Sequence, residues 1–160
     1  MSLQARIDAL KERHANLRWR YVTGEEFTND YVYAVKSRET DVFHERYRQL
    51  DALVIDLQDV GARIYTFVYT MANCLRAAAR HRIPVVVCDR PNPIGGGGVG
   101  GNMLKPEWAS FVGPYPLPMR HGLSAGEFLS FAAGYHGLDV PLTVIQAPGW
   151  SRTIWPADTQ

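Results

Sequence analysis

Two apolar segments, separated by the length of one helix, most strongly constrain the fold of this chain. Residues 53–66 begin as an apolar strand and end as the opening of a helix. Residues 83–88 are apolar and rich in β-branched side chains, as expected of a strand buried on both faces. The intervening residues 62–82 keep an apolar helical stripe without proline. This order predicts a right-handed βαβ unit, and hence an α/β fold with an open, mostly parallel, Rossmann-like sheet and helices on both faces.

Polar side chains gather where these two predicted strands end. The first junction carries Asp56, Gln58, Asp59, Arg63 and Tyr65. The second junction carries Asp89, Arg90 and Asn92. Because ligands of open α/β sheets bind at the carboxyl ends of the strands, these residues are candidates for a functional site. The structural alternative is that Asp59 caps the following helix and Arg63 pairs with it.

A second group of candidates surrounds a predicted helix at residues 124–135. Ser124 and Glu127 have the spacing of a capping box, so Glu127 has a structural interpretation as well as a functional one. His121 lies just before the helix start, where the helix dipole favours a neutral imidazole. It could contact a substrate hydroxyl or carboxylate, or it could bond only to backbone.

The last candidates follow a predicted parallel strand at residues 141–146. Trp150 could stack on the apolar face of a sugar ring, or it could be a core or interface tryptophan. Arg152 could hold a carboxylate in a bidentate fork.

A glycine run at residues 95–98, followed by Gly100 and Gly101, raises the question of a phosphate loop. The Gly-Lys-Ser/Thr sequence of such a loop does not follow. A dinucleotide fingerprint would need its glycines between the first strand and its helix. A mobile lip over a binding cleft, or plain surface slack, is therefore the expectation. Residues 111–118 are rich in proline and aromatics, which predicts an ordered loop rather than a central strand.

Composition sets outer limits on the function. The net charge of +1 over 160 residues argues against a general binder of nucleic acid or anionic membranes. No apolar run reaches transmembrane length, and the start of the sequence has no apolar signal-peptide core, which predicts a cytoplasmic chain as it stands. Cys74 and Cys88 are expected to be buried thiols, and neither a metal site nor a cofactor is predicted. We divide the chain into an N-terminal helix with an irregular segment at 1–30 and an α/β domain at 31–160.

Three motifs in a fixed order give the chain a resemblance to a known family. They are residues 56–66, 89–93 and the segment from 111 to 127. The pattern resembles the DUF1343 family, whose characterised members are NamZ-type exo-β-N-acetylmuramidases. The resemblance covers Tyr31 to Trp155, and family members can be exported. It implies a glycoside hydrolase that releases N-acetylmuramic acid from the non-reducing end of peptidoglycan fragments, with a peptidoglycan-derived muramyl sugar as partner.

The resemblance also suggests roles for the candidate residues. The catalytic candidates are Asp56, Asp59, Asp89 and His121. The substrate-binding candidates are Gln58, Arg63, Tyr65, Arg90, Asn92, Glu127, Trp150 and Arg152. Glycoside cleavage needs a proton donor and a second group that acts on the anomeric carbon, and two close carboxylates could supply both.

A second account fits the departures from the family pattern. Family members are longer, and they carry an upstream Glu-His-Gly segment with a candidate catalytic carboxylate that this sequence lacks. We favour this account, in which the catalytic acid lies elsewhere and the carboxylates orient Arg63 and Arg90. A non-catalytic binding module for muramyl sugars or a protein, and a nucleotide- or phosphosugar-binding domain, remain alternatives. The sequence predicts no oligomeric state.

Overall fold

The computed structural model describes residues 50–110 and 113–153, and the structural statements below refer to these residues. The chain divides into two units, residues 1–51 and 52–160, so the description falls almost entirely within the second unit. The predicted N-terminal helix and the predicted start of the α/β domain at residue 31 lie outside the described residues.

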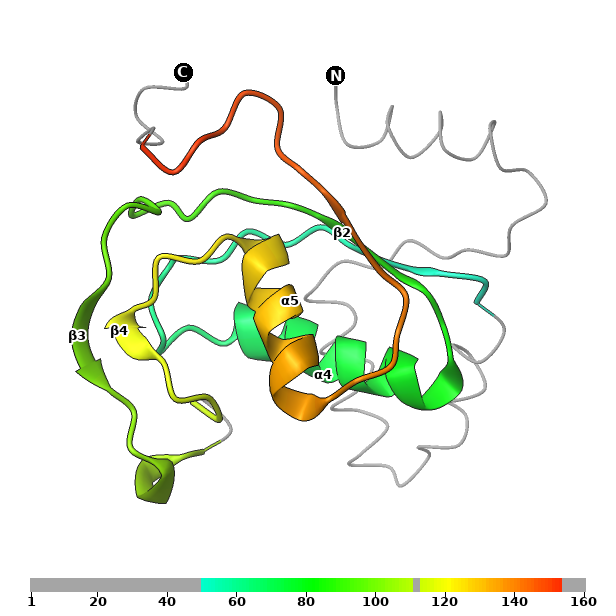
Figure 1. Cartoon of the computed structure of the whole chain (residues 1–160), viewed down its shortest axis with the longest axis horizontal. Coiled ribbons are helices and arrows are strands. Elements are labelled where there is room, and N and C mark those ends of the chain that lie inside the picture. The colour runs from blue at the N-terminus through cyan, green and yellow to red at the C-terminus, as the bar shows by residue number, and fades with distance from the viewer. Residues whose placement is uncertain (1–49, 111–112, 154–160) are drawn as a thin grey trace, which may run out of the picture. The chain divides into compact units, whose positions relative to one another are not determined.

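Three parallel strands form the central sheet (Figure 1). They are β1 (Leu53–Ile55), β2 (Val85–Cys88) and β5 (Leu142–Ile145), in the order β1-β2-β5. Leu53 pairs with Val85 in the register, and Val85 pairs in turn with Leu142. The α/β fold with an open, mostly parallel sheet is therefore confirmed.

Two helices cover one face of this sheet. Helix α4 (Phe67–His81) connects β1 to β2, and α5 (Ala125–His136) precedes β5. The helices pack against each other, and α5 also contacts β2 and β5, so both described helices lie on the same side of the sheet (Figure 1). Their apolar faces bury a core with alternate strand residues, including Ile55, Val85, Val87, Tyr69, Leu75, Phe128 and Leu129.

Helix α4 begins at Phe67, five residues later than the sequence pattern predicts. The cause is a pairing with a distant segment. Ala62 forms an isolated antiparallel bridge with Arg120, and the Arg63 amide donates a 2.8 Å hydrogen bond to the Met119 carbonyl. Backbone groups engaged in this way are not available for a helical turn, so the predicted helix start is wrong.

A small antiparallel pair lies beside the main sheet, and the sequence did not predict it. Strand β3 (Gly100–Met103) pairs with β4 (Pro118–Arg120), and a short 3₁₀ helix at Pro106–Trp108 lies in the connection. Gly100 and Gly101 therefore belong to a strand rather than to a mobile lip or a slack surface segment. Pro118 begins an edge strand, a position where proline's missing donor is tolerated.

Helix α5 begins as the sequence predicts. Ser124 is its N-cap, and the capping box with Glu127 is present in both directions. Gly126, in the first turn, lets the helix approach the sheet closely. A Cβ atom at this position would lie 2.5 Å from the Val144 side chain and 3.2 Å from the Asp89 carboxylate.

We expect Gly126→Ala to destabilise the protein by about 1–3 kcal/mol, because the added methyl group overlaps the Val144 side chain. Gly134→Ala is the matched control in the same helix, since a Cβ there meets nothing within 4 Å. The control should gain about 0.5–1 kcal/mol from the better helix propensity of alanine. Urea unfolding of both variants measures the difference, and equal stability would contradict the close packing of α5 on β5.

Candidate functional site

The carboxyl ends of β1 and β2 bring the two polar junctions together. Asp56 and Arg90 form a bidentate pair, with 2.7 Å from Nε to Oδ1 and 2.9 Å from Nη2 to Oδ2. The hydrogen bond to Asp56 is the main cause that raises the pKa of Arg90. The Arg90 side chain remains 41% exposed and the Asp56 side chain 21%, so a ligand can reach both. A guanidinium has five N–H donors, and those not used by Asp56 remain available.

Gln58 ties the same two junctions together through its amide. Its Nε2 atom donates hydrogen bonds of 2.9 Å to the Asp59 carbonyl and 3.1 Å to the Pro91 carbonyl. The Gln58 residue is exposed, so a ligand can reach it.

Asp59 and His121 form a buried polar couple beneath this edge. Asp59 Oδ2 accepts a 2.7 Å hydrogen bond from the Gly61 amide and lies 3.6 Å from His121 Nε2. The Leu123 amide donates to His121 Nδ1, so a neutral ring carries its proton on Nε2, facing the carboxylate. The two residues are only 6% and 4% exposed. Among the described residues, Asp59 Oδ1 has no hydrogen-bond partner.

The structural alternative for Asp59 and Arg63 is not observed. The N-cap of α4 is Thr66, without a side-chain capping bond. Arg63 Nη1 instead donates to the carbonyls of Asn102, at 2.9 Å, and Leu117, at 2.6 Å. This buried guanidinium therefore holds the start of the α4 connection against the β3 and β4 segments.

Asp89 is occupied by the beginning of α5. Its Oδ2 accepts a hydrogen bond from Ser124 Oγ at 3.0 Å, and its Oδ1 accepts one from the Gly126 amide at 2.8 Å. A carboxylate is favoured at this helix end, where the dipole is positive. Asp89 is 8% exposed, and it joins the end of β2 to the start of α5.

Asn92 and Tyr65 complete the two junctions. Asn92 donates to the Leu123 carbonyl at 3.2 Å and accepts from the Ile94 amide at 3.1 Å, and it is buried. Tyr65 lies half-buried with its ring centroid 4.7 Å from that of Phe67. Asn92 therefore shapes the loop after β2, whereas Tyr65 belongs to the turn before α4.

Arg152 joins the loops of Gly96 and Gly122 to the first turn of α5. Its Nη1 donates to the carbonyls of Gly96, at 3.0 Å, and Gly122, at 3.1 Å, and its Nη2 pairs with Glu127. Gly96 is buried, and a Cβ atom there would lie 3.3 Å from the Trp150 ring. Gly96 is thus packed against Arg152 and Trp150, whereas Gly97 is exposed, so the glycine run is not slack along its whole length.

A cavity of about 460 Å³ opens between Trp150 and the first turn of α5. It is lined by Asp89, Gly126, Glu127, Ser130, Val144, Gln146, Ala147 and Trp150. Ser130 and Gln146 were not among the residues predicted for the site. Gln146 had a clear signal, because it is the last residue of the predicted strand and lies at the same carboxyl edge. Ser130 had none, since only the packing of α5 on the sheet brings it there.

Among the described residues, no group of three or more His, Cys, Asp or Glu side chains is placed to hold a metal ion. In the same part of the chain, no helix is long and apolar enough to cross a membrane.

The fold is an α/β domain in which polar side chains gather at the carboxyl edge of a parallel sheet. A family model described as "Exo-beta-N-acetylmuramidase NamZ, N-terminal" matches residues 12–160, and the chain belongs to this family. It is 41% identical over 136 residues to the peptidoglycan beta-N-acetylmuramidase NamZ of Bacillus subtilis (strain 168), covering 85% of this chain and 33% of that protein.

Solved structures agree with this membership. A crystal structure of a DUF1343 family protein from Bacteroides fragilis NCTC 9343 superposes with a TM-score of 0.67 at 35% identity, covering 72% of this chain and 30% of that one. A second DUF1343 protein of the same strain gives 0.65 at 31% identity, covering 69% and 32%. The chain thus spans about a third of the length of these relatives.

A shorter likeness points to a different protein. The chain is 40% identical over 75 residues to the chromosomal replication initiator protein DnaA of Chloroflexus aggregans, covering 44% of this chain and 15% of that protein. The lengths of the NamZ match and the DnaA match together exceed the chain, so the two likenesses share residues.

We expect Asp89→Ala to lower the free energy of unfolding by about 2–4 kcal/mol, because two hydrogen bonds to a buried carboxylate are lost at the start of α5. Asp139→Ala removes an exposed aspartate after the same helix and should change stability by less than about 0.5 kcal/mol. Thermal and urea unfolding provide the measurement. A small effect of Asp89→Ala would show that α5 does not depend on this anchor.

Proposed function

We propose that this chain binds the N-acetylmuramic acid end of peptidoglycan fragments and forms the sugar-binding part of an exo-β-N-acetylmuramidase. The observation that carries the proposal is the 41% identity to NamZ across 85% of the chain. The geometry supports it, because accessible polar and aromatic side chains meet at the carboxyl edge where α/β domains bind ligands.

Arg90 is our candidate for the lactyl carboxylate of the sugar. Its guanidinium is held in a fixed orientation by Asp56, with two bonds at 2.7 Å and 2.9 Å, and still presents unused donors to solvent. Arginine forks suit carboxylates because two N–H groups match two oxygens. Asp56 is then a positioning residue for Arg90.

The cavity beside Trp150 is our candidate for the sugar ring. Its half-buried indole offers an apolar face, whereas Gln146, Ser130 and Glu127 offer polar groups. This combination of one aromatic wall with a few polar groups is typical of small-ligand sites. Arg152 holds the walls together through Gly96, Gly122 and Glu127 and would position Trp150 rather than bind the sugar.

The catalytic acid is proposed to lie outside the three aspartates at the edge. Asp56 pairs with Arg90, Asp89 binds the start of α5, and Asp59 is buried with His121. A proton donor to the glycosidic oxygen must reach the substrate, and the burial of Asp59, Asp89 and His121 leaves them poorly placed for that. These groups support the site, and the hydrolysis itself needs a further carboxylic acid.

Sugar binding tests the role of Arg90. We expect N-acetylmuramic acid to bind the parent chain more tightly than N-acetylglucosamine, which lacks the lactyl carboxylate. Arg90→Gln should remove most of this preference, roughly tenfold, because one charge-assisted contact is worth about 1.5–3 kcal/mol. Lys105→Gln removes a positive charge elsewhere and should leave the preference intact. Calorimetric titration measures it, and an unchanged preference in Arg90→Gln would exclude Arg90 as the carboxylate contact.

Hydrolysis of a chromogenic N-acetylmuramic acid glycoside tests the proposed activity separately. We expect turnover when the remaining segments of the Bacillus relative are added to this chain, and little turnover without them. Activity in the parent chain that Asp56→Asn abolishes, with folding intact, would instead place catalysis on the described carboxylates. No turnover in either preparation would refute the glycosidase proposal and favour a binding module.

The likeness to DnaA raises the question of DNA binding. It covers 44% of this chain and 15% of the relative, and the chain's net charge of +1 offers little attraction to a phosphate backbone. We therefore expect no binding of duplex DNA at about 0.15 M salt, where exposed charges are screened beyond about 8 Å. Fluorescence anisotropy with a labelled duplex checks this, and saturable binding would contradict the expectation.

A further inference from the structure

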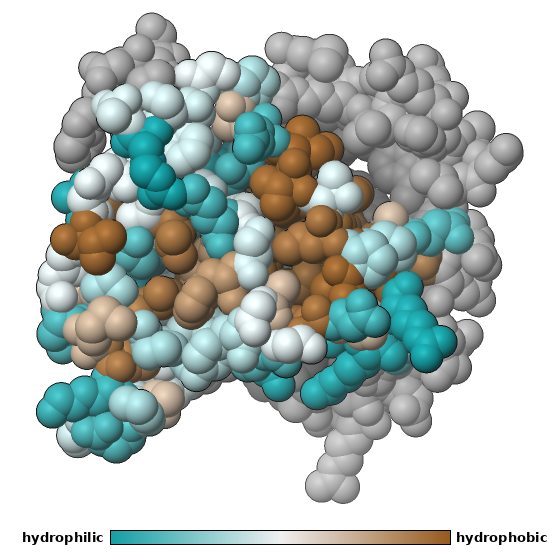
Figure 2. Space-filling model, in the orientation of Figure 1, coloured by the Kyte–Doolittle hydropathy of each residue, from teal (hydrophilic) through white to brown (hydrophobic). Residues whose placement is uncertain are grey.

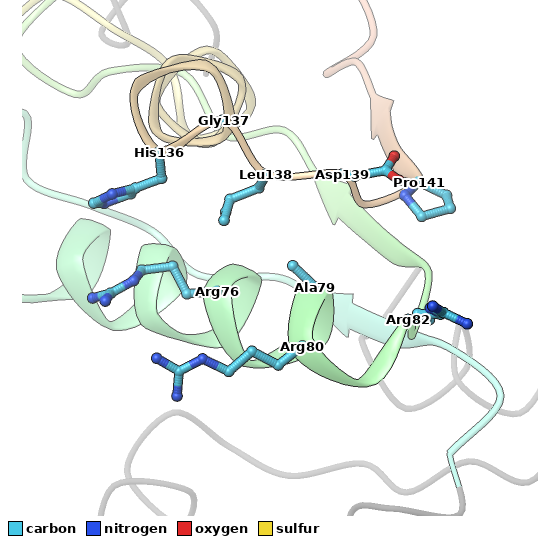
Figure 3. Close-up of a pocket in the computed structure, with 9 residues that line it drawn as sticks. All are labelled: Arg76, Ala79, Arg80, Arg82, His136, Gly137, Leu138, Asp139 and Pro141. Carbon is cyan, nitrogen blue, oxygen red and sulfur yellow. The ribbon is translucent and has the colours of Figure 1, made fainter.

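A second cleft lies at the opposite end of the sheet from the candidate sugar site. Its walls come from the last turns of α4, the end of α5 and the segment that enters β5 (Figure 3). Arg82 precedes β2 and Pro141 precedes β5, so the cleft lies at the amino ends of these strands. Its volume is about 680 Å³, within the range of small-molecule sites.

Positive charge dominates the lining of this cleft. Arg76, Arg80 and Arg82 line it, with Asp139 as the one carboxylate among the described lining residues. Arg80 and Arg82 form no ion pair within the described part of the chain, and Arg76 has only a 3.5 Å contact with Asn73 Oδ1. Figure 2 shows a strongly hydrophilic patch over the C-terminal end of α4. Like charges four residues apart on a helix repel each other. Arg76 and Arg80 have this spacing, and no described carboxylate pairs with either of them.

The helix dipole explains only part of this arrangement. Cations stabilise the last turn of a helix, which accounts for Arg80 in α4 and His136 in α5. Arg76 lies more than one turn before the end of α4, where that effect has faded. Two carbonyls near the end of each helix are also bonded, because the amides of Arg82 and Gly137 donate back to them.

Arg82 occupies a position that normally favours glycine. It is the C-cap of α4 with φ of 55°, and it is the one non-glycine residue with positive φ among the described residues. The equivalent position of α5 is Gly137, with φ of 58°. A side chain in the left-handed region costs conformational energy that glycine avoids. Arg82 has this unfavourable backbone conformation at the rim of the cleft, where its side chain adds a third guanidinium group.

His136 faces the arginines from the opposite wall. Its Nε2 atom lies 3.1 Å from the Tyr115 hydroxyl, and its side chain extends in the same direction as that of Arg76 (Figure 3). Burial and the charge of Arg76 lower the pKa of His136. At neutral pH the ring is therefore a neutral hydrogen-bonding group near the Arg76 guanidinium.

We infer that this cleft binds a small, multiply charged oxyanion of the phosphate or carboxylate class, held by Arg76 and Arg80 with His136 on the opposite wall. Arginine matches the oxygens of such groups through its planar fork. An anion here would relieve the repulsion between Arg76 and Arg80, which no described carboxylate does. The inference is independent of the proposed sugar site, since none of these residues lies at the carboxyl edge.

Calorimetric titration of the full chain with pyrophosphate and with citrate tests the inference and distinguishes the two oxyanion classes. We expect saturable binding of at least one probe, weakened roughly tenfold or more in the double variant Arg76→Gln with Arg80→Gln. Asp139→Asn removes the opposing charge and should strengthen binding severalfold. Lys105→Gln, a charge removal in the β3–β4 connection, should bind as the parent does.

The pKa of His136, followed through the NMR resonances of its imidazole ring, is a second measurement that a purely structural role of the arginines would not change. The titratable groups around the ring are Arg76 on α4, Tyr115, Tyr135 and, in the cleft, Asp139. A bound anion should raise the pKa of His136, because negative charge favours the imidazolium. Absence of saturable binding by the parent, or equal binding by the double arginine variant and Lys105→Gln, would overturn the inference. If the parent chain binds duplex DNA more tightly than either oxyanion, and the double arginine variant abolishes that binding, the cleft is a nucleic-acid surface instead of an oxyanion site.

Discussion

Two hydrogen bonds from the start of α5 to the Asp89 carboxylate organise the carboxyl edge of the sheet. A carboxylate at the end of β2 accepts from Ser124 Oγ and from the Gly126 amide, and Gly126 has no side chain to keep the helix away. A buried carboxylate needs such partners, because an unpaired charge in the interior is costly. This anchor sets where α5 begins, and the positions of Glu127 and Ser130 in the cavity follow from it.

The polar residues at the edge divide into two groups by burial. Asp59, Arg63, Asp89, Asn92 and His121 are buried and bind backbone or one another, so they fix the loops. Arg90, Gln58 and Trp150 remain accessible, so a ligand can reach them. Buried polar networks of this kind hold a site rigid only when nearly every group has a partner. The Asp59–His121 couple departs from this, since Asp59 Oδ1 and His121 Nε2 have no hydrogen-bond partner among the described residues.

The sequence predicted the elements whose signals are local. The β-branched run before Cys88 and the capping box at Ser124 each depend on a few neighbouring residues, and both elements are present. The true start of α4 could not be predicted, because it depends on the bridge between Ala62 and Arg120, residues far apart in the sequence. Strand β3 was missed for a related reason. Its glycines have little strand propensity, and only pairing with β4 places them in a strand.

The same distinction applies to the site. Asp56 and Arg90 were predicted to share an edge because parallel strands place their carboxyl ends together, and they form a bidentate pair. The hydrogen bonds and ion pairs described above for the predicted site residues join residues of the described part of the second unit. Binding a sugar needs only groups of this kind, fixed in advance. Cleaving a glycosidic bond also needs an acid that can reach the leaving oxygen, and the buried carboxylates at this edge are already committed to the fold.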